Sequence, residues 1–330
     1  MTPTVVCVGP HIIDVLARPV SEIPAGQGGV LLEEARVTAA GTAAGTAVDL
    51  AKLGAEVSSI GAIGDDTAGR LVRMLLQEHG VDASRLAIKP GLQTSTTILP
   101  IRANGERPSL HAPGATASLT ADDVDWQLIA ESDVLHVGGP DALGAFGADV
   151  VPGLLKFAKE HGTVTTVDLL RTVVDPGLLT MLEAAWPHID YFLPNDDQVR
   201  ALTGAAEVEA AARFMRDRGV GTVIVTMGGE GSYVLGDGVA ERIPAFACRV
   251  VDTTGCGDAY TAGLIVGLHH GWQVDVAARL GTAAAALVAG GLGSDAGIVD
   301  LPGTLAFWRD RADEIGAEPP GLVDVTAKPS

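Results

Sequence analysis

Short runs of apolar, often β-branched residues alternate along this chain with longer segments of helical periodicity. Strands mostly separated by helices need crossover connections, which place them parallel in one sheet. The runs are continuously apolar, as in strands that are covered on both faces. We therefore predict an α/β fold with a mainly parallel central sheet. The expected strands are 4–8, 57–62, 133–137, 163–167, 191–193, 222–225 and 232–235, and the expected helices are 42–53, 67–79, 148–161, 196–202, 208–218, 257–270 and 274–289.

Two segments, roughly residues 15–38 and 94–112, break this alternation. The first is rich in glycine, proline and valine and has no helical period. The second alternates and contains Asn104-Gly105, which is a strong hairpin turn signal. Because neither segment could bury a face alone, we expect them to form one small β-strand lid inserted in a single domain of residues 1–330.

Composition limits the class of partner. The chain has 330 residues and a net charge of −19, which repels phosphate backbones and anionic lipids. Nucleic acid and membrane surfaces are therefore poor partners. Three scattered cysteines form neither a disulfide framework nor a zinc cluster, and the N-terminus lacks the basic region of a secretory signal. These features favour a cytoplasmic location.

The string DTTGCGD at residues 252–258, followed by an apolar helix, carries the sharpest chemical signal. Gly255 and Gly257 bracket Cys256, so successive backbone N–H groups can point into one concavity at a helix N-terminus. Such a turn suits a transferring phosphoryl group. Asp258, in the first helical turn, could accept a proton from an attacking hydroxyl, and the helix dipole should keep it ionised. An ordinary capped helix start is the simpler alternative for a GxGD match alone.

This string resembles the DTxGAGD signature of the ribokinase-like (PfkB) carbohydrate kinase family. Residues 39–70 resemble the other signature of that family, 193–198 its NxxE segment, and 223–232 its nucleotide-binding strand and turn. The motifs stand in family order over nearly the whole chain. The resemblance implies a three-layer α/β/α ribokinase-like domain, whose β lid covers the sugar site and often forms a homodimer contact.

The resemblance also implies a role for each matching residue. Asp258 would be the catalytic base, with an anion hole made by Gly255, Cys256 and Gly257. The implied substrate-binding positions are Asp14 and Gly41, and the implied ATP-binding positions are Asn195, Thr226, Gly228 and Gly231. From their places in the chain we add Gly45, His11 and His111 as candidate substrate-binding residues and Thr282 as a candidate ATP-binding residue. Mg²⁺ would be held through water by Asn195 and Gln198, and a potassium ion, on which family members depend to varying degrees, by Asp252, Thr254, Val288, Gly291 and Gly293.

Several positions depart from the family pattern. Gly45 stands where the family carries an asparagine that binds a sugar hydroxyl, and Gly139 where ribokinases place a glutamate, although Asp141 is close. These losses argue against ribose as the substrate. Gln198 replaces the glutamate of NxxE, which either tunes the magnesium arrangement mildly or weakens it. Cys256 replaces alanine, either as an inert small residue or as a thiol whose pKa is lowered by the helix N-terminus.

Three residues in the predicted lid or just before it allow two interpretations each. His11 and His111 could contact the substrate or be loop histidines, and Arg107 could reach an anionic substrate or remain a solvated charge.

The expected activity is ATP-dependent phosphorylation of a hydroxymethyl group on a sugar or sugar-like substrate, with Asp258 as the general base. One alternative is a nucleoside kinase of the same fold, for which an aromatic content of 4% offers few stacking partners. The other is a catalytically weak protein that senses a sugar or nucleotide.

Overall fold

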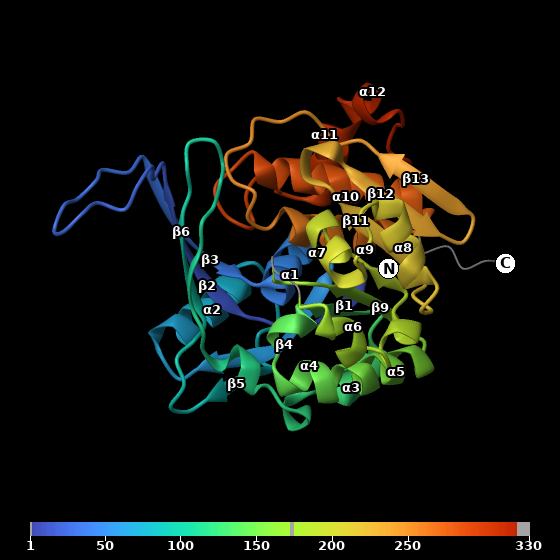
Figure 1. Ribbon diagram of the computed structural model, residues 1–330, viewed down its shortest axis with the longest axis horizontal. Coiled ribbons are helices and arrows are strands. Elements are labelled where there is room, and N and C mark those ends of the chain that lie inside the picture. Colours follow the sequence, from blue (N-terminus) through green and yellow to red (C-terminus); the bar gives the residue numbers. More distant parts are fainter. Residues whose placement is uncertain (1, 172–174, 322–330) are drawn as a thin grey trace.

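A computed structural model describes residues 2–171 and 175–321 of the chain. Within them, nine strands form one sheet in the order β13-β12-β11-β10-β9-β8-β1-β4-β5 (Figure 1). Neighbours from β11 to β5 are parallel, and β12 and β13 add an antiparallel hairpin at one edge. The strands are β1 (Thr4–Val8), β4 (Glu56–Gly64), β5 (Leu86–Lys89), β8 (Val134–Gly138), β9 (Val164–Asp168), β10 (Tyr191–Phe192), β11 (Thr222–Thr226), β12 (Ser232–Gly236) and β13 (Val239–Ile243).

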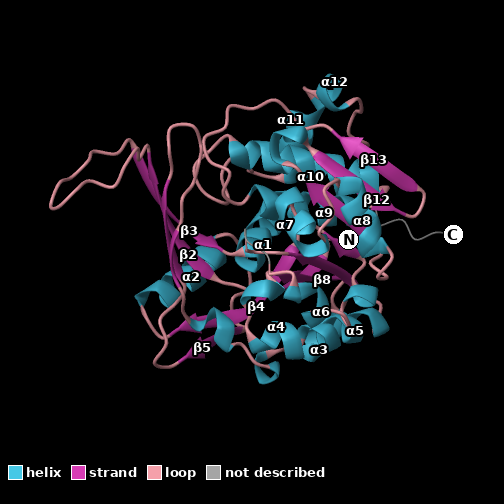
Figure 2. Ribbon diagram, in the orientation of Figure 1, coloured by secondary structure: helices cyan, strands magenta, loops and turns pink. Residues whose placement is uncertain are grey.

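Helices cover both faces of this sheet (Figure 2). In β1, Val5 and Cys7 pack with one helical layer, whereas Val6 and Val8 pack with the other. This alternation confirms the predicted α/β/α layering and explains why the strands are apolar throughout. The first layer holds α1 (Thr42–Lys52), α2 (Thr67–Glu78), α9 (Cys256–His269), α10 (Val274–Ala289), α11 (Leu301–Arg309) and α12 (Ala312–Ile315). The second holds α3 (Trp126–Glu131), α4 (Ala145–Asp149), α5 (Val151–Glu160), α6 (Gly177–Met181), α7 (Asp196–Thr203) and α8 (Val208–Arg216). None of the helices described is long and apolar enough to cross a membrane.

The helix predicted over 148–161 is wrong at its start. The structure has two helices here, α4 and α5, that meet at Val150. Pro152 lies in the first turn of α5, where a missing N–H costs nothing, but its ring would clash in the interior of a longer helix. Proline therefore favours a new helix start at Val151, one residue before it.

The two segments that break the alternation pair with each other, as predicted. They form a separate four-stranded sheet in the order β3-β2-β6-β7, which stands at one side of the body (Figure 1). Its strands are β2 (Ile12–Arg18), β3 (Glu34–Ala40), β6 (Thr96–Pro100) and β7 (Leu110–Ala112). We call this sheet the lid. The hairpin expected at Asn104-Gly105 is present, with Gly105 at φ +85° and its N–H donated to the carbonyl of Arg102 at 3.0 Å.

The lid rests on the body through a small apolar cluster. Leu16 and Leu99, on neighbouring lid strands, pack with Ile101 against Leu292 of the segment that follows α10. All four side chains are at most 3% exposed to solvent. Burying this apolar surface holds the lid over the end of the sheet where the parallel strands finish.

Candidate active site

One cavity of about 1010 Å³ opens under the lid, at the carboxyl ends of the parallel strands. This is where open α/β sheets bind ligands, because the connections diverge there. Motifs that are distant in sequence meet in it. Of the predicted site residues, the following line the cavity: Asp14, Gly41, His111, Asn195, Gln198, Thr226, Gly228, Gly231, Thr254, Gly255, Cys256, Gly257, Asp258 and Thr282.

The predicted anion hole is a tight turn that opens α9. Gly255 caps the helix in the left-handed region, at φ +80° and ψ −1°. A Cβ at this position would lie 2.4 Å from the Cα of Ser294, so only glycine fits. Gly255, Cys256 and Gly257 line the cavity, so the N-terminus of α9 opens onto it, and N–H groups there that have no helical partner suit an anion.

Asp258 follows this turn and is buried. Burial raises the pKa of its carboxyl to about 7, while the charge of Arg107 opposes this rise and the charge of Asp14 adds to it. Desolvation therefore opposes the ionised state that we expected from the helix dipole, and with a pKa near 7 both forms of Asp258 are populated at neutral pH. A pKa near 7 suits a group that takes a proton during reaction and then returns it to solvent.

Gly45 lies behind Asp258 and does not line the cavity. A Cβ at position 45 would stand 2.4 Å from Oδ2 of Asp258 and 3.0 Å from its Cγ. Glycine therefore leaves room on α1 for the carboxyl group, and the prediction of a substrate contact at this position finds no support in the geometry.

The strand register of the lid builds a polar row across it. Asp14 lies opposite Thr38 on β3 and opposite Thr97 on β6, and Thr97 lies opposite His111 on β7. Opposed residues share a face, and Asp14, Thr97 and His111 all line the cavity. His111 Nδ1 is 3.1 Å from Thr97 Oγ1. Burial raises the pKa of Asp14 to about 6, although hydrogen bonding to Thr97 and the charge of Arg107 oppose the rise.

His11 does not join this row. It is fully buried, its Nδ1 lies 2.9 Å from the carbonyl oxygen of Gly9, and burial lowers its pKa to about 4. The ring sits over Gly61, where a Cβ would come within 2.1 Å of Nδ1. The structure therefore makes His11 a neutral interior histidine outside the cavity, in place of the predicted substrate contact.

Asp168 is a site residue that the sequence analysis missed. It ends β9, lines the cavity, and lies near Gly257, where a Cβ would be 3.8 Å from its Oδ2. Burial raises its pKa well above the usual value, and the charge of Asp258 adds to the rise. The available signal was its place at the carboxyl end of a buried parallel strand, one residue beyond the predicted strand.

Asn195 and Gln198 form a reciprocal cap at the start of α7. Asn195 Oδ1 accepts from the N–H of Gln198 at 2.8 Å, and Gln198 Oε1 accepts from the N–H of Asn195 at 2.8 Å. The amide nitrogen of Gln198 also donates to the carbonyls of Leu169 and Arg171, at 3.1 and 3.0 Å. A glutamate could not make these last two bonds when ionised, because it has no donor. Gln198 therefore ties α7 to the loop after β9.

The other predicted ATP contacts cluster beside this cap. The backbone N–H of Thr226 donates to the carbonyl of Pro194 at 3.1 Å, which joins the end of β11 to the Asn195 segment. Gly228 and Gly231 form the next turn, closed by a 3.0 Å bond from the N–H of Gly231. Thr282 reaches the same cavity from α10.

Cys256 lines the cavity but is not activated. Burial raises the pKa of its thiol to about 12, and the charge of Asp252 adds to this effect. The prediction of a lowered pKa for the Cys256 thiol is therefore wrong, and the alternative, that Cys256 is an inert small residue, is the one that agrees with the structure.

The predicted cation loop is assembled from both of its segments. Asp252 Oδ1 accepts from the N–H of Thr254 at 3.0 Å and from its hydroxyl at 2.8 Å. Oδ2 accepts from the N–H of Gly293 at 3.0 Å. In the second segment, the N–H of Gly291 donates to the carbonyl of Val288 at 3.0 Å. Asp252 therefore links the turn before α9 to the segment after α10.

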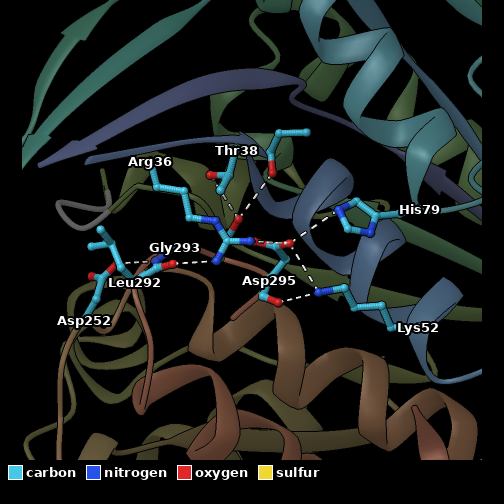
Figure 3. A network of polar contacts seen from close by, with 10 residues as sticks. Arg36, Thr38, Lys52, His79, Asp252, Leu292, Gly293 and Asp295 are labelled. Carbon is cyan, nitrogen blue, oxygen red and sulfur yellow. Dashed lines mark hydrogen bonds and ion pairs between the residues drawn. The ribbon is translucent and has the colours of Figure 1, made fainter. Parts of the chain in front are cut away.

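A polar network fixes that segment to the lid and to α1 (Figure 3). Asp295 contacts Arg36 of β3 at 2.9 Å, Lys52 of α1 at 3.2 Å and His79 after α2 at 3.4 Å. Arg36 also donates to the carbonyl of Leu292 at 2.8 Å. Although burial opposes ionisation, the hydrogen bond with His79 and the charges of Lys52 and Arg36 hold the pKa of Asp295 well below its usual range.

Comparisons with known proteins agree with this geometry. The family model for pfkB family carbohydrate kinases matches residues 2–300. The chain is 28% identical to a ribokinase of Haemophilus influenzae over 81% of this chain and 86% of that protein. It is 30% identical to an ATP-dependent ribose-1-phosphate kinase of Halopiger xanaduensis over 84% of this chain and 88% of that protein. A ribokinase-like crystal structure from E. coli, solved with ATP and Mg²⁺, shares the fold with a TM-score of 0.81 at 21% identity, covering 94% of this chain and 100% of its own.

Proposed function

This chain belongs to the pfkB family of carbohydrate kinases, and we propose that it transfers the γ-phosphoryl group of ATP to a hydroxymethyl group of a sugar or sugar-like acceptor. The observation that carries the proposal is the placement of Asp258. It stands beside the anion-hole turn and shares one cavity with the acidic lid residue Asp14 and with the cap at Asn195. A base, an anion hole and two binding ends are the parts that phosphoryl transfer needs.

The acceptor end lies between the lid and α9. Asp14 accepts hydrogen bonds from acceptor hydroxyls, and the closed lid excludes water that would otherwise take the phosphoryl group. The hydroxymethyl oxygen forms a bond to the γ-phosphorus as the bond from that phosphorus to the β,γ-bridging oxygen breaks. The proton of the attacking hydroxyl passes to the carboxylate of Asp258, and the N–H groups after Gly255 stabilise the charge on the transferring group.

The donor end lies along Asn195, Thr226 and Gly228, with Gly231 and Thr282 beside them. Among the residues described, no cluster of three or more acidic, histidine or cysteine side chains could hold a metal ion by itself. Mg²⁺ would not need such a cluster, because it keeps several waters and binds mainly through substrate phosphates, whose charge it neutralises. Because the polar atoms of Gln198 and Oδ1 of Asn195 are engaged with backbone groups, we assign the water-mediated contacts mainly to the neighbouring carboxylate of Asp197, which lines the same cavity.

A monovalent cation fits the loop that Asp252 assembles, because a buried carboxylate and the carbonyls of Val288 and Gly291 supply oxygen donors. Its positive charge would add to the electrostatic stabilisation of an anion bound at the turn that opens α9. The test is kcat in potassium chloride against kcat in tetramethylammonium chloride at equal ionic strength. Equal rates would remove the cation from the proposal.

The direct test of function is ADP release from MgATP across pentoses, hexoses, sugar acids, sugar phosphates and nucleosides. We expect saturable turnover on at least one acceptor, and Asp258→Asn should lower kcat by about 10²- to 10⁴-fold, because it removes the proton acceptor. ATP binding by the variant, measured by calorimetry, should stay within about twofold of wild type. Full activity in Asp258→Asn would refute the base, and ligand binding without turnover in the wild type would favour a sensor.

The outer face of the lid supports a homodimer contact. Val37, Ile98 and Leu110 lie in one row of the register around Val15 and are 40%, 49% and 55% exposed. Exposed apolar rows on a sheet often mark a partner surface. Sedimentation velocity should find a dimer that Ile98→Glu converts to a monomer, and a wild-type monomer at micromolar concentration would refute this contact.

A further inference from the structure

The tip of the β6–β7 hairpin of the lid is built onto the segment that precedes the anion hole. A Cβ at Gly105 would touch Val250 Cγ1 at 3.0 Å, so the tip packs closely there. Two residues later, Arg107 Nε donates to the hydroxyl of Thr253 at 3.2 Å. Arg107 is exposed, but this bond ties its guanidinium next to the DTTGCGD turn.

The charge of Arg107 acts on the acceptor end of the cavity. Arg107 lines the cavity, and its charge reaches both Asp14 and Asp258. Among the residues described, however, Arg107 forms no direct ion pair with a carboxylate. Arg102, on the same hairpin, pairs with Glu106 at 2.6 Å. Arg171, which also lines the cavity, likewise forms no ion pair among the described residues, but it lies in the loop after β9 beside Gln198, whereas Arg107 stands on the lid.

We propose that Arg107 selects an acceptor that carries an anionic group, a phosphate or a carboxylate, in addition to the hydroxyl that is phosphorylated. The inference rests on the kinase function proposed above. A hydroxyl placed between Asp14 and Asp258 leaves the rest of a small acceptor under the lid tip, within the reach of Arg107. The planar guanidinium still has N–H groups beyond Nε, and these match the paired oxygens of a phosphate or carboxylate.

The place of Arg107 in the fold favours this role over contact with the transferring phosphoryl group. Arg107 belongs to the hairpin that also carries Thr97 and His111, so it moves with the acceptor row. The ATP contacts, by contrast, come from the body of the protein. A guanidinium that acted on the transferring group would accelerate all acceptors alike, whereas one that holds the acceptor discriminates between them.

The test compares Arg107→Gln with wild type on matched acceptors: a neutral sugar, its phosphate monoester and its sugar acid. Arg102→Gln, on the same hairpin but ion-paired, is the control for lid damage. We expect wild type to prefer an anionic acceptor by at least about tenfold in kcat/KM. Arg107→Gln should lose about 10- to 100-fold on that acceptor, mainly through KM, and less than about threefold on the neutral sugar. The phosphate and carboxylate arms show which anion is taken.

Other outcomes would refute the role of Arg107 without refuting the proposed kinase function. Turnover on neutral sugars with no gain on anionic ones would overturn the role of Arg107 and leave the kinase intact. An equal loss of kcat on every acceptor would also overturn it, in favour of phosphoryl contact. If no acceptor is turned over, calorimetry with the same sugars decides: anionic binding that depends on Arg107 supports the inference while the kinase function fails, and its absence refutes both.

Discussion

Placing a methyl group at position 45 tests how closely α1 is fitted to the carboxyl of Asp258, the proposed base. Gly45 lies in the interior of α1, and a Cβ there would stand 2.4 Å from Oδ2 of Asp258. Ordinary van der Waals contact begins near 3.4 Å. Gly45→Ala therefore forces the carboxyl of Asp258 to move by about 1 Å, because the other atoms at this contact belong to two helices packed face to face.

The size of the effect follows from that displacement. A misplacement of about 1 Å in a catalytic group can cost on the order of 10²-fold in rate, so we expect kcat to fall about 100-fold. The KM for ATP should change less than about twofold, because the donor end is not touched. The free energy of unfolding should fall by about 0–2 kcal/mol, because alanine gains about 1 kcal/mol in a helix interior while the overpacking costs about 1–3 kcal/mol.

The assay is steady-state ADP release, with urea unfolding of the same preparations. Gly153→Ala is the matched control, because Gly153 lies inside α5 with nothing within 4 Å of a new Cβ. We expect that control to keep wild-type kcat and to gain up to about 1 kcal/mol of stability. A folded Gly45→Ala protein with wild-type kcat would show that the carboxyl of Asp258 does not need its present position, and the catalytic argument would fail.

Three further predictions concern buried polar groups. Because burial raises the folded-state pKa of Asp258 to about 7, ionising this carboxyl destabilises the folded protein, and the free energy of unfolding falls as the pH rises from about 4 to 7. Asp258→Asn removes this penalty, so it should raise the free energy of unfolding by roughly 1–3 kcal/mol more at pH 8 than at pH 5. An equal change at both pH values would contradict the raised pKa. Gln198→Glu should cost about 1–3 kcal/mol in urea unfolding, because it removes the donor to the carbonyls of Leu169 and Arg171; an unchanged midpoint would speak against that role. Asp295→Asn should lower the free energy of unfolding by about 2 kcal/mol at pH 7. The decrease should be smaller below about pH 4, because the carboxyl group is then protonated in the unfolded chain and the folded state loses the advantage of holding it ionised. An equal decrease at pH 3 and pH 7 would count against the network.

The sequence predicts the layers well, because the central strands are buried on both sides and read as continuous apolar runs. The sheet edges were harder. β5 and β13 escaped detection, and β13 (Val239–Ile243) alternates partly buried and exposed residues before it ends at the buried Ile243. An edge hairpin of this kind has no helix on its flank to signal a crossover, so the alternation rule does not find it.

Site residues within contiguous motifs could be predicted, whereas those that depend on pairing could not. Asp258 and Gly255 belong to one string, and the structure places them together. Thr97 enters the acceptor row only through its register opposite Asp14, and no local pattern specifies that register. His11 shows the opposite error: its position near Asp14 in sequence suggested a substrate contact, but its ring turns inward to the carbonyl of Gly9.

Two of the departures from the family pattern, Gln198 and Gly45, have different physical consequences, and together they indicate where acceptor specificity would lie. Gln198 preserves the donor end, because an amide can both cap α7 and hold the loop after β9. Gly45 changes the acceptor end, because α1 gives its space to the carboxyl of Asp258 and offers the acceptor no side chain there. If the proposed function holds, we expect recognition to come from the lid, through Asp14 and its row and through Arg107. Substitutions on α1 should therefore change kcat for every acceptor, whereas substitutions on the lid should change which acceptor is used.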